Sequence, residues 1–213
     1  MPTFLLIRHG ENDYVKTGKM AGRLPGVHLN ERGQEQAEAL GLALKDVPLS
    51  AVYSSPLERA IETATPIIAG RGLEIQLISD LMDTDVGEWQ GQELKHLYKL
   101  PEWKNVQQVP SRFHFPGGES FIGLQTRMIN VFESLARKHG DDEIVAVVFH
   151  ADPMKLVLAY YLGMPLDTFQ RLSCDTGSLS ILRLVKGGAQ VSGTNLKPPF
   201  TLPKPPEKRG KKK

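Results

Sequence analysis

"TFLLIRHGEN", residues 3–12, is an unbroken apolar run followed directly by Arg8 and His9. A continuous apolar run without alternation is typical of a strand that is covered on both faces in a parallel sheet. "IVAVVF", residues 144–149, has the same pattern and leads into His150. The two segments predict buried strands that deliver polar side chains to their carboxyl ends.

Helix and strand patterns alternate through the rest of the chain. Apolar residues recur at helical spacing over 30–47, 55–70, 120–140 and 152–163. Strand patterns occupy 51–55, 74–78 and 178–185. Asn30 is the expected N-cap of the first helix, and Ser55 with Glu58 forms an expected capping box for the second. This alternation predicts an α/β fold with a mainly parallel sheet between helical layers.

The composition fits a globular protein with one main domain. Of 213 residues, 40% are hydrophobic and 23% are charged, which is ordinary for a soluble domain. We expect one domain over residues 1–196. From residue 197 to 213 proline and lysine dominate, and this composition predicts a disordered tail.

Several classes of protein are disfavoured. The net charge is +2, and the body lacks the basic density of a nucleic-acid-binding surface. The run at 144–149 is too short to span a membrane, and the first ten residues do not resemble a signal peptide. Cys174 is the only cysteine, which fits a reducing compartment. We therefore expect a cytoplasmic protein with no nucleic-acid or membrane partner.

Candidate site residues converge at one edge of the predicted sheet. In open parallel sheets, ligands bind outside the carboxyl ends of the strands. Arg8 and His9 end the first buried strand, and His150 ends the other. Arg59 lies in the first turn of the helix after strand 51–55. Two histidines and two arginines at one edge predict an anion site. Phosphate is the obvious candidate, because guanidinium groups match its oxygens.

Four motifs, in order along the chain, extend this interpretation. They are "RHGEN" (8–12), "VYSSPLERAIETA" (52–64), "LMDTDVGEWQG" (81–91) and "VVFHADP" (147–153). With them the chain resembles the histidine phosphatase superfamily, which includes cofactor-dependent phosphoglycerate mutases. The resemblance runs from about residue 3 to 185. It implies a three-layer α/β/α fold and phosphoryl transfer through a phosphohistidine, without a metal ion or other cofactor.

The resemblance also implies roles for individual residues. His9 would be the nucleophile, since a neutral imidazole is available near physiological pH. Arg8, Arg59 and His150 would hold the equatorial oxygens of the transferring phosphoryl group. Asp83 would then protonate the leaving oxygen.

The proton donor and one phosphate ligand depart from the common pattern. Many relatives have a glutamate where this chain has Asp83. One branch uses an aspartate directly after the second histidine, but here Ala151 separates His150 from Asp152, which is also suited to N-cap the following helix. We take Asp83 as the expected donor and Asp152 as the alternative.

Relatives often carry a phosphate-binding asparagine seven residues after the motif arginine, where this chain has Val15. Asn12 either supplies an amide to phosphate instead or caps a turn. Arg23, near the expected site mouth, either meets a charged substrate or is a solvated loop residue. Glu119 is expected to do no more than favour the start of the helix at 120.

Three functions remain open from the sequence. The favoured one is a metal-independent phosphomonoester phosphatase for a small phosphorylated substrate. The alternative is mutase-type phosphoryl transfer, which needs further cations to retain a small acid. The third is a non-catalytic phospho-ligand binding protein, which would not need His9 and a proton donor together. The sequence assigns neither the physiological substrate nor an oligomeric state.

Overall fold

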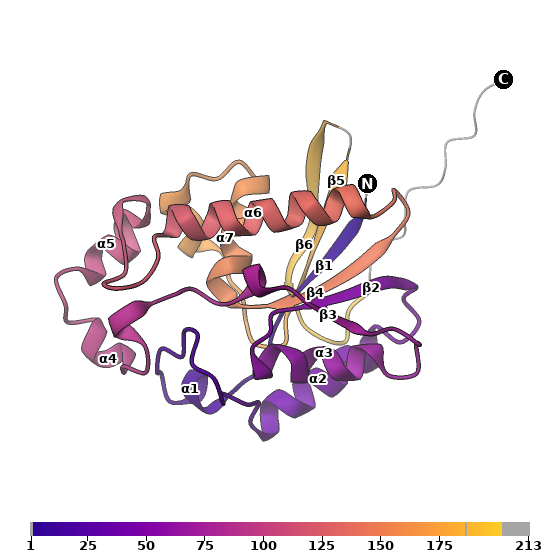
Figure 1. Ribbon diagram of the computed structural model, residues 1–213, viewed down its shortest axis with the longest axis horizontal. Coiled ribbons are helices and arrows are strands. Elements are labelled where there is room, and N and C mark those ends of the chain that lie inside the picture. Colours follow the sequence, from indigo (N-terminus) through magenta and orange to yellow (C-terminus); the bar gives the residue numbers. More distant parts are fainter. Residues whose placement is uncertain (1, 186, 202–213) are drawn as a thin grey trace.

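A six-stranded sheet forms the centre of the computed structural model, which describes residues 2–185 and 187–201 (Figure 1). The strands lie in the order β3-β2-β4-β1-β5-β6. Their bounds are Thr3–Arg8 (β1), Leu49–Ser54 (β2), Ile75–Leu77 (β3), Ile144–Phe149 (β4), Leu179–Val185 (β5) and Gly188–Leu196 (β6). Strands β3, β2, β4 and β1 are parallel, whereas β5 and β6 add to this group in antiparallel fashion. The predicted mainly parallel sheet is confirmed.

Helices cover both faces of the sheet. Their bounds are Asp13–Lys16 (α1), Glu31–Ala43 (α2), Glu58–Ile68 (α3), Leu94–Leu97 (α4), Trp103–Gln108 (α5), Phe121–Lys138 (α6) and Ala151–Tyr161 (α7). Helices α6 and α7 lie over one face, and α2 and α3 lie over the other (Figure 1). The three-layer α/β/α fold is therefore confirmed.

The burial of β1 explains its unbroken apolar sequence. Phe4 and Leu6 pack in the core cluster beneath α6 and α7, whereas Leu5 and Ile7 pack in the cluster beneath α2 and α3. Each of these side chains is at most 1% exposed. Complete burial of such a side chain contributes about 1.5–3 kcal/mol. Alternate residues thus stabilise opposite layers, and a polar side chain at any of these positions would be buried away from water.

Two glycines let α2 approach the loop that follows β1. A Cβ atom on Gly10 would lie 2.5 Å from the carbonyl oxygen of Gly33, and one on Gly33 would lie 2.0 Å from the carbonyl oxygen of Glu11. The backbone of Gly10 also donates to Thr63 Oγ1 of α3 over 2.9 Å. Because neither glycine has a side chain, α2 and the loop after β1 pack backbone against backbone, which fixes the loop that carries His9.

The structure corrects the predicted start of α3. Asn30 caps α2 as expected, since its side chain accepts from Gly33 N. Ser55, in contrast, does not cap α3, which begins at Glu58 without a side-chain cap. The reason is that Ser55 N still donates to Val148 O over 2.9 Å, so Ser55 remains paired with β4 and cannot begin a helix.

The chain beyond β5 differs from the sequence-based expectation. Strand β6 was not predicted, because its sequence contains few apolar residues and it lies half-exposed at the sheet edge. Lys197 Nζ lies 2.7 Å from Asp175 Oδ2, and Phe200 packs against the cluster beneath α2 and α3. Contacts with the body therefore continue past the boundary predicted at Lys197. Residues 202–213 of the predicted tail lie outside the described residues.

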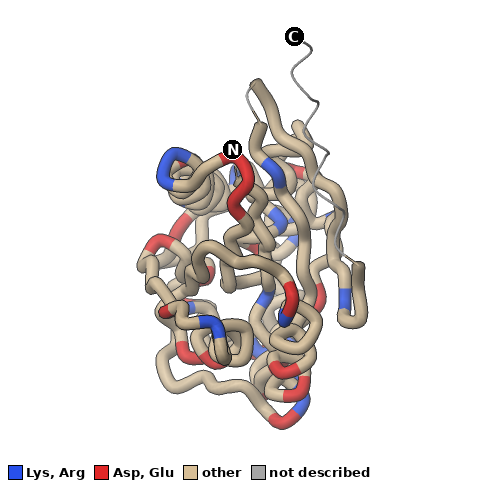
Figure 2. The backbone as a smooth tube through the Cα atoms, turned by 90° about the vertical axis from the view of Figure 1, so that its right-hand side faces the viewer, with Lys and Arg blue, Asp and Glu red and all other residues tan. Residues whose placement is uncertain are grey.

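Charges of both signs are interspersed over the molecule. Lys and Arg positions alternate with Asp and Glu positions on the side shown in Figure 2. Within residues 2–185 and 187–201, none of the helices combines the length and apolar composition that a membrane span requires.

Candidate active site

The two predicted histidines meet at the carboxyl edge of the central strands. His9 directly follows β1 and His150 directly follows β4, and these strands are parallel neighbours with Arg8 opposite Phe149. The imidazole centroids are 5.1 Å apart. Arg59 lies in the first turn of α3, and its side chain is fully buried beside them. The expected convergence at one edge is confirmed.

One ring nitrogen of His9 is committed to the backbone. Its Nδ1 lies 2.7 Å from the carbonyl oxygen of Gly10. Because a carbonyl only accepts, Nδ1 carries the proton and the neutral ring has its lone pair on Nε2. Burial lowers the pKa of His9 well below its usual value, and His150, Arg59 and Arg8 lower it further. The ring is therefore a neutral nitrogen base near pH 7.

The arginines leave buried donors without partners. Arg8 donates through one terminal nitrogen to Cys174 O over 2.6 Å, and Arg59 NH2 donates to Gly22 O over 2.7 Å. Arg8 Nε, Arg59 Nε and Arg59 NH1 are buried with no hydrogen-bond partner among the described residues. Buried unpaired donors are costly. Their presence beside His9 indicates a cradle for an anion.

Asn12 has the predicted capping role and also retains a free amide donor. Its Oδ1 accepts from Val15 N over 2.9 Å and so caps α1. Its Nδ2 is buried and has no hydrogen-bond partner within the described part of the chain. The cap fixes the amide, so that the free donor has one orientation. Val15 itself lies on α1 and is partly exposed.

His150 is held at one nitrogen and free at the other. Its Nε2 lies 2.9 Å from Ser55 Oγ. Its Nδ1 is buried without a hydrogen-bond partner in residues 2–185 and 187–201, and it lies 3.5 Å from Asp83 Oδ2. Burial lowers the pKa of His150 well below its usual value, and Arg59 and Arg8 act in the same direction.

Asp83 lies beside this cluster, whereas Asp152 has other contacts. Asp83 Oδ2 is 3.2 Å from Arg59 NH2, and Oδ1 accepts from Thr84 N over 2.9 Å. Asp152 sits within the first turn of α7, whose N-cap is His150, so the predicted capping role is wrong. The helix begins at Ala151, two residues earlier than that role requires. Asp152 Oδ1 instead lies 3.3 Å from Lys155 Nζ.

A charged network that was not predicted holds the backbone of Asp83. Arg23 Nε and Arg127 NH2 approach Asp83 O at 2.9 and 3.4 Å. Both guanidinium groups also donate to Glu119 Oε1, at 3.1 and 2.7 Å. The same oxygen accepts from Asp85 N over 2.8 Å. Glu119 thus joins two arginines to the loop of Asp83, rather than only favouring the start of α6.

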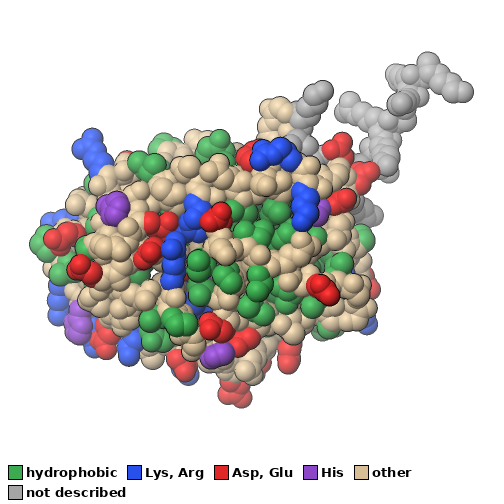
Figure 3. Space-filling model, viewed as in Figure 1, with side chains coloured by type: hydrophobic (Ala, Val, Ile, Leu, Met, Phe, Trp, Pro, Cys, Tyr) green, Lys and Arg blue, Asp and Glu red, His purple; other side chains and the backbone are tan. Residues whose placement is uncertain are grey.

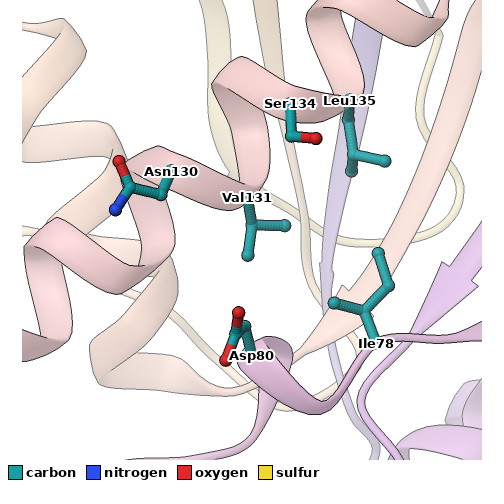
Figure 4. Close-up of a pocket in the computed structure, with 6 residues that line it drawn as sticks. All are labelled: Ile78, Asp80, Asn130, Val131, Ser134 and Leu135. Carbon is teal, nitrogen blue, oxygen red and sulfur yellow. The ribbon is translucent and has the colours of Figure 1, made fainter.

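A separate groove lies outside the anion cradle. On the face shown in Figure 3, hydrophobic side chains gather between α6 and the opposite helical layer. The groove lies between α6 and the segment after β3, and Figure 4 shows its lining. The lining residues are Ile78, Asp80, Asn130, Val131, Ser134 and Leu135. None of the predicted site residues is among them, so the groove is not the candidate active site.

The family is decided by comparison with known proteins. The model of the histidine phosphatase superfamily (branch 1) matches residues 4–197. The chain belongs to this superfamily. It is 31% identical over 186 residues to phosphoserine phosphatase 1 of Hydrogenobacter thermophilus. This alignment covers 86% of this chain and 87% of the relative. It is 28% identical to the adenosylcobalamin/alpha-ribazole phosphatase of Salmonella typhimurium, over 89% of this chain and 94% of the relative.

Solved structures agree with this assignment. Bacillus stearothermophilus YhfR superposes on this histidine phosphatase with a TM-score of 0.84 and 27% sequence identity. The superposition covers 90% of this chain and 96% of YhfR. The sequence-based resemblance to the superfamily is therefore confirmed.

Proposed function

We propose that this histidine phosphatase hydrolyses a small phosphomonoester through a phosphohistidine at His9. The observation that carries the proposal is the set of buried, unpartnered donors next to His9, on Arg8, Arg59, Asn12 and His150. A phosphoryl group has oxygens to accept from each of them. The names of the two curated relatives, a phosphoserine phosphatase and an alpha-ribazole phosphatase, support this reaction class.

The reaction has two displacements. The lone pair of His9 Nε2 attacks phosphorus, the bond between phosphorus and the ester oxygen breaks, and the protonated Asp83 carboxyl gives that oxygen its proton. Water then attacks the phosphohistidine, the phosphorus–nitrogen bond breaks, and the Asp83 carboxylate accepts the proton that the water loses. His9 is returned neutral and inorganic phosphate leaves.

The protein's own cations supply the charge that this transfer requires. Phosphoryl transfer is accelerated mainly by positioning and by neutralisation of the equatorial oxygens. Arg8 and Arg59 flank His9 and retain free nitrogens for that purpose. We therefore propose that the reaction needs no metal ion.

The engagement of the nearby arginines favours hydrolysis over mutase chemistry. A mutase must retain an acidic product, which requires cations beyond those that hold the phosphoryl group. Arg23 donates to Asp83 O, Asp85 and Glu119. Arg127 donates to Glu119 and to carbonyls of residues 80, 82 and 83. These guanidinium groups are committed to the protein, which leaves them poorly suited to grip a second anionic group.

Two measurements test the proposal. Phosphoserine, alpha-ribazole phosphate and 3-phosphoglycerate are assayed for release of inorganic phosphate, with and without a chelator. A rapid quench with labelled substrate is then used to trap acid-labile, base-stable phosphate on the wild type and none on His9→Asn. Isomer formation without free phosphate would support the mutase instead. Loss of activity with the chelator would reject the metal-free reaction.

A further inference from the structure

Ser55 is a buried hydroxyl beside the second histidine. It is fully buried, and its main-chain nitrogen donates to Val148 O over 2.9 Å, which extends the pairing of β2 with β4 by one residue. Its Oγ lies 2.9 Å from His150 Nε2. Because His150 directly follows β4, the two strands set the position of both side chains.

The surroundings of Ser55 Oγ determine the direction of this hydrogen bond. Leu57 N, at 3.4 Å, is the other hydrogen-bond partner of Ser55 Oγ within the described residues, and an amide nitrogen only donates. The hydroxyl hydrogen is buried and needs an acceptor. Nε2 of His150 is an acceptor when the ring is neutral, and burial with nearby Arg59 and Arg8 keeps its pKa low. Ser55 therefore donates and His150 Nε2 accepts.

A neutral imidazole that accepts at Nε2 carries its proton at Nδ1. In His150 this nitrogen is the buried one without a hydrogen-bond partner among the described residues. It lies 3.5 Å from Asp83 Oδ2, and the same carboxylate oxygen lies 3.2 Å from Arg59 NH2. The opposite tautomer would turn a lone pair towards a phosphoryl oxygen, and two acceptors would then face each other.

We infer that Ser55 is a positioning residue that fixes His150 as the Nδ1–H tautomer, so that the transferring phosphoryl group meets a neutral N–H donor. The inference rests on the proposed function, because it takes the phosphoryl group as the ligand of Nδ1. Ser55 acts through His150 rather than on the substrate, since its side chain is fully buried and its Oγ is engaged with His150 Nε2. A histidine oriented by a neighbouring hydrogen bond is a general device of catalytic sites.

The tautomer is measured directly by nitrogen-15 NMR of the histidine side chains. Signals of His150 are assigned by their absence in His150→Asn. In the wild type we expect a protonated, pyrrole-type Nδ1 and an unprotonated, pyridine-type Nε2. Addition of orthovanadate should shift the Nδ1 signal most. In Ser55→Ala the two nitrogen signals should move towards each other, because the tautomers then interconvert. An Nε2–H tautomer in the wild type, or an unchanged spectrum in Ser55→Ala, overturns the inference.

Kinetics provide the second readout, with a matched control on the same strand. Ser54 is equally buried, and its hydroxyl donates to the carbonyl oxygen of Ser55 rather than to His150. We expect Ser55→Ala to lower kcat by about 10- to 100-fold with little change in KM. Ser54→Ala should leave kcat near the wild-type value, and Ser55→Thr, which keeps the hydroxyl, should restore both kcat and the tautomer.

The outcomes separate this inference from the proposed function. A wild type that releases no phosphate and traps no phosphohistidine rejects the proposed function. The spectrum still tests the contact of Ser55 with His150 in that case. An active wild type in which Ser55→Ala has normal kcat rejects only the role of Ser55. Should Ser55→Ala fail to fold, the wild-type tautomer and its response to vanadate decide the question alone.

Discussion

The rings of His9 and His150 lie 5.1 Å apart between centroids and at 60° to each other, at the ends of adjacent parallel strands. The two rings present different atoms to the space between them. His9 is tied through Nδ1 to Gly10 O, which leaves Nε2 as its free nitrogen, whereas His150 is tied through Nε2 to Ser55 and leaves Nδ1. One strand edge thus presents a ring nitrogen with a free lone pair on His9 and, in the inferred tautomer, an N–H donor on His150.

The buried histidines should make stability depend on pH. Their pKa values are lowered in the folded protein, whereas in the unfolded chain they are near 6.5. The unfolded state therefore binds protons first as the pH falls below about 6.5, and the folded state loses up to about 1.4 kcal/mol per pH unit for each histidine until its lowered pKa is reached. His9→Asn should be less sensitive to pH in this range. Urea melts at several pH values between 7.5 and 5 give the free energy of unfolding of both proteins. Plots of this free energy against pH that run parallel for the wild type and His9→Asn would contradict the prediction.

Replacement of Asp83 by asparagine should affect esters according to their leaving groups. An alkyl phosphate expels a strongly basic alkoxide, whereas para-nitrophenyl phosphate expels a stable phenolate. General acid catalysis is worth ~10²–10⁴-fold, and most of this should be lost with the alkyl ester alone. The burst rate is the observable, because in the proposed reaction Asp83 also serves the hydrolytic step. Asp152→Asn is the control, and an equal loss with both esters in Asp83→Asn would show that this residue is not the acid.

Arg59→Lys should be nearly as damaging as Arg59→Ala. Lysine keeps the charge but lacks the planar guanidinium that reaches Gly22 O and Asp83 while leaving two further nitrogens free. We expect kcat to fall about 10²- to 10³-fold and vanadate to bind more weakly. Arg32→Lys, an exposed arginine of α2, is the matched control. Near-normal kcat in Arg59→Lys would show that charge alone suffices.

Glu119→Gln should weaken the hold on the loop of Asp83. The substitution keeps the shape of the side chain but removes the negative charge shared by Arg23 and Arg127. We expect a loss of about 1–3 kcal/mol in the free energy of unfolding and a lower kcat with alkyl esters. Urea melts and burst kinetics measure the two effects, with Glu88→Gln, an exposed residue of the same region, as control. A stable variant with normal alkyl-ester kinetics would exclude this role.

The sequence predicted the features that follow from burial and strand direction. Strands β1 and β4 were predicted because covering on both faces requires a continuous apolar run. The meeting of His9, His150 and Arg59 followed from the direction of parallel strands. The capping role predicted for Ser55 was wrong, because Ser55 pairs with β4 instead of capping α3. The sequence around Ser55 and Glu58 carries no sign of this pairing with a distant strand.

The network around Asp83 was not predictable from local sequence. Arg127 lies on an amphipathic helix, where an arginine is ordinarily solvated, and its partners Asp80 O and Met82 O are more than 40 residues away in the chain. Such contacts depend on how α6 packs against the segment that follows β3. Arg23 and Glu119 were noticed in the sequence, but their meeting requires the folded arrangement of three separate segments.

The neighbours of β1 in the sheet have a consequence for the order of assembly during synthesis. Strand β1 pairs only with β4 and β5 among the described strands, and neither is complete before residue 149 has been made. At about 5–20 residues per second, His9 precedes His150 by roughly 7–30 seconds. The anion cradle therefore cannot be complete before His150 has been made, and the contact of Arg8 with Cys174 O forms later still.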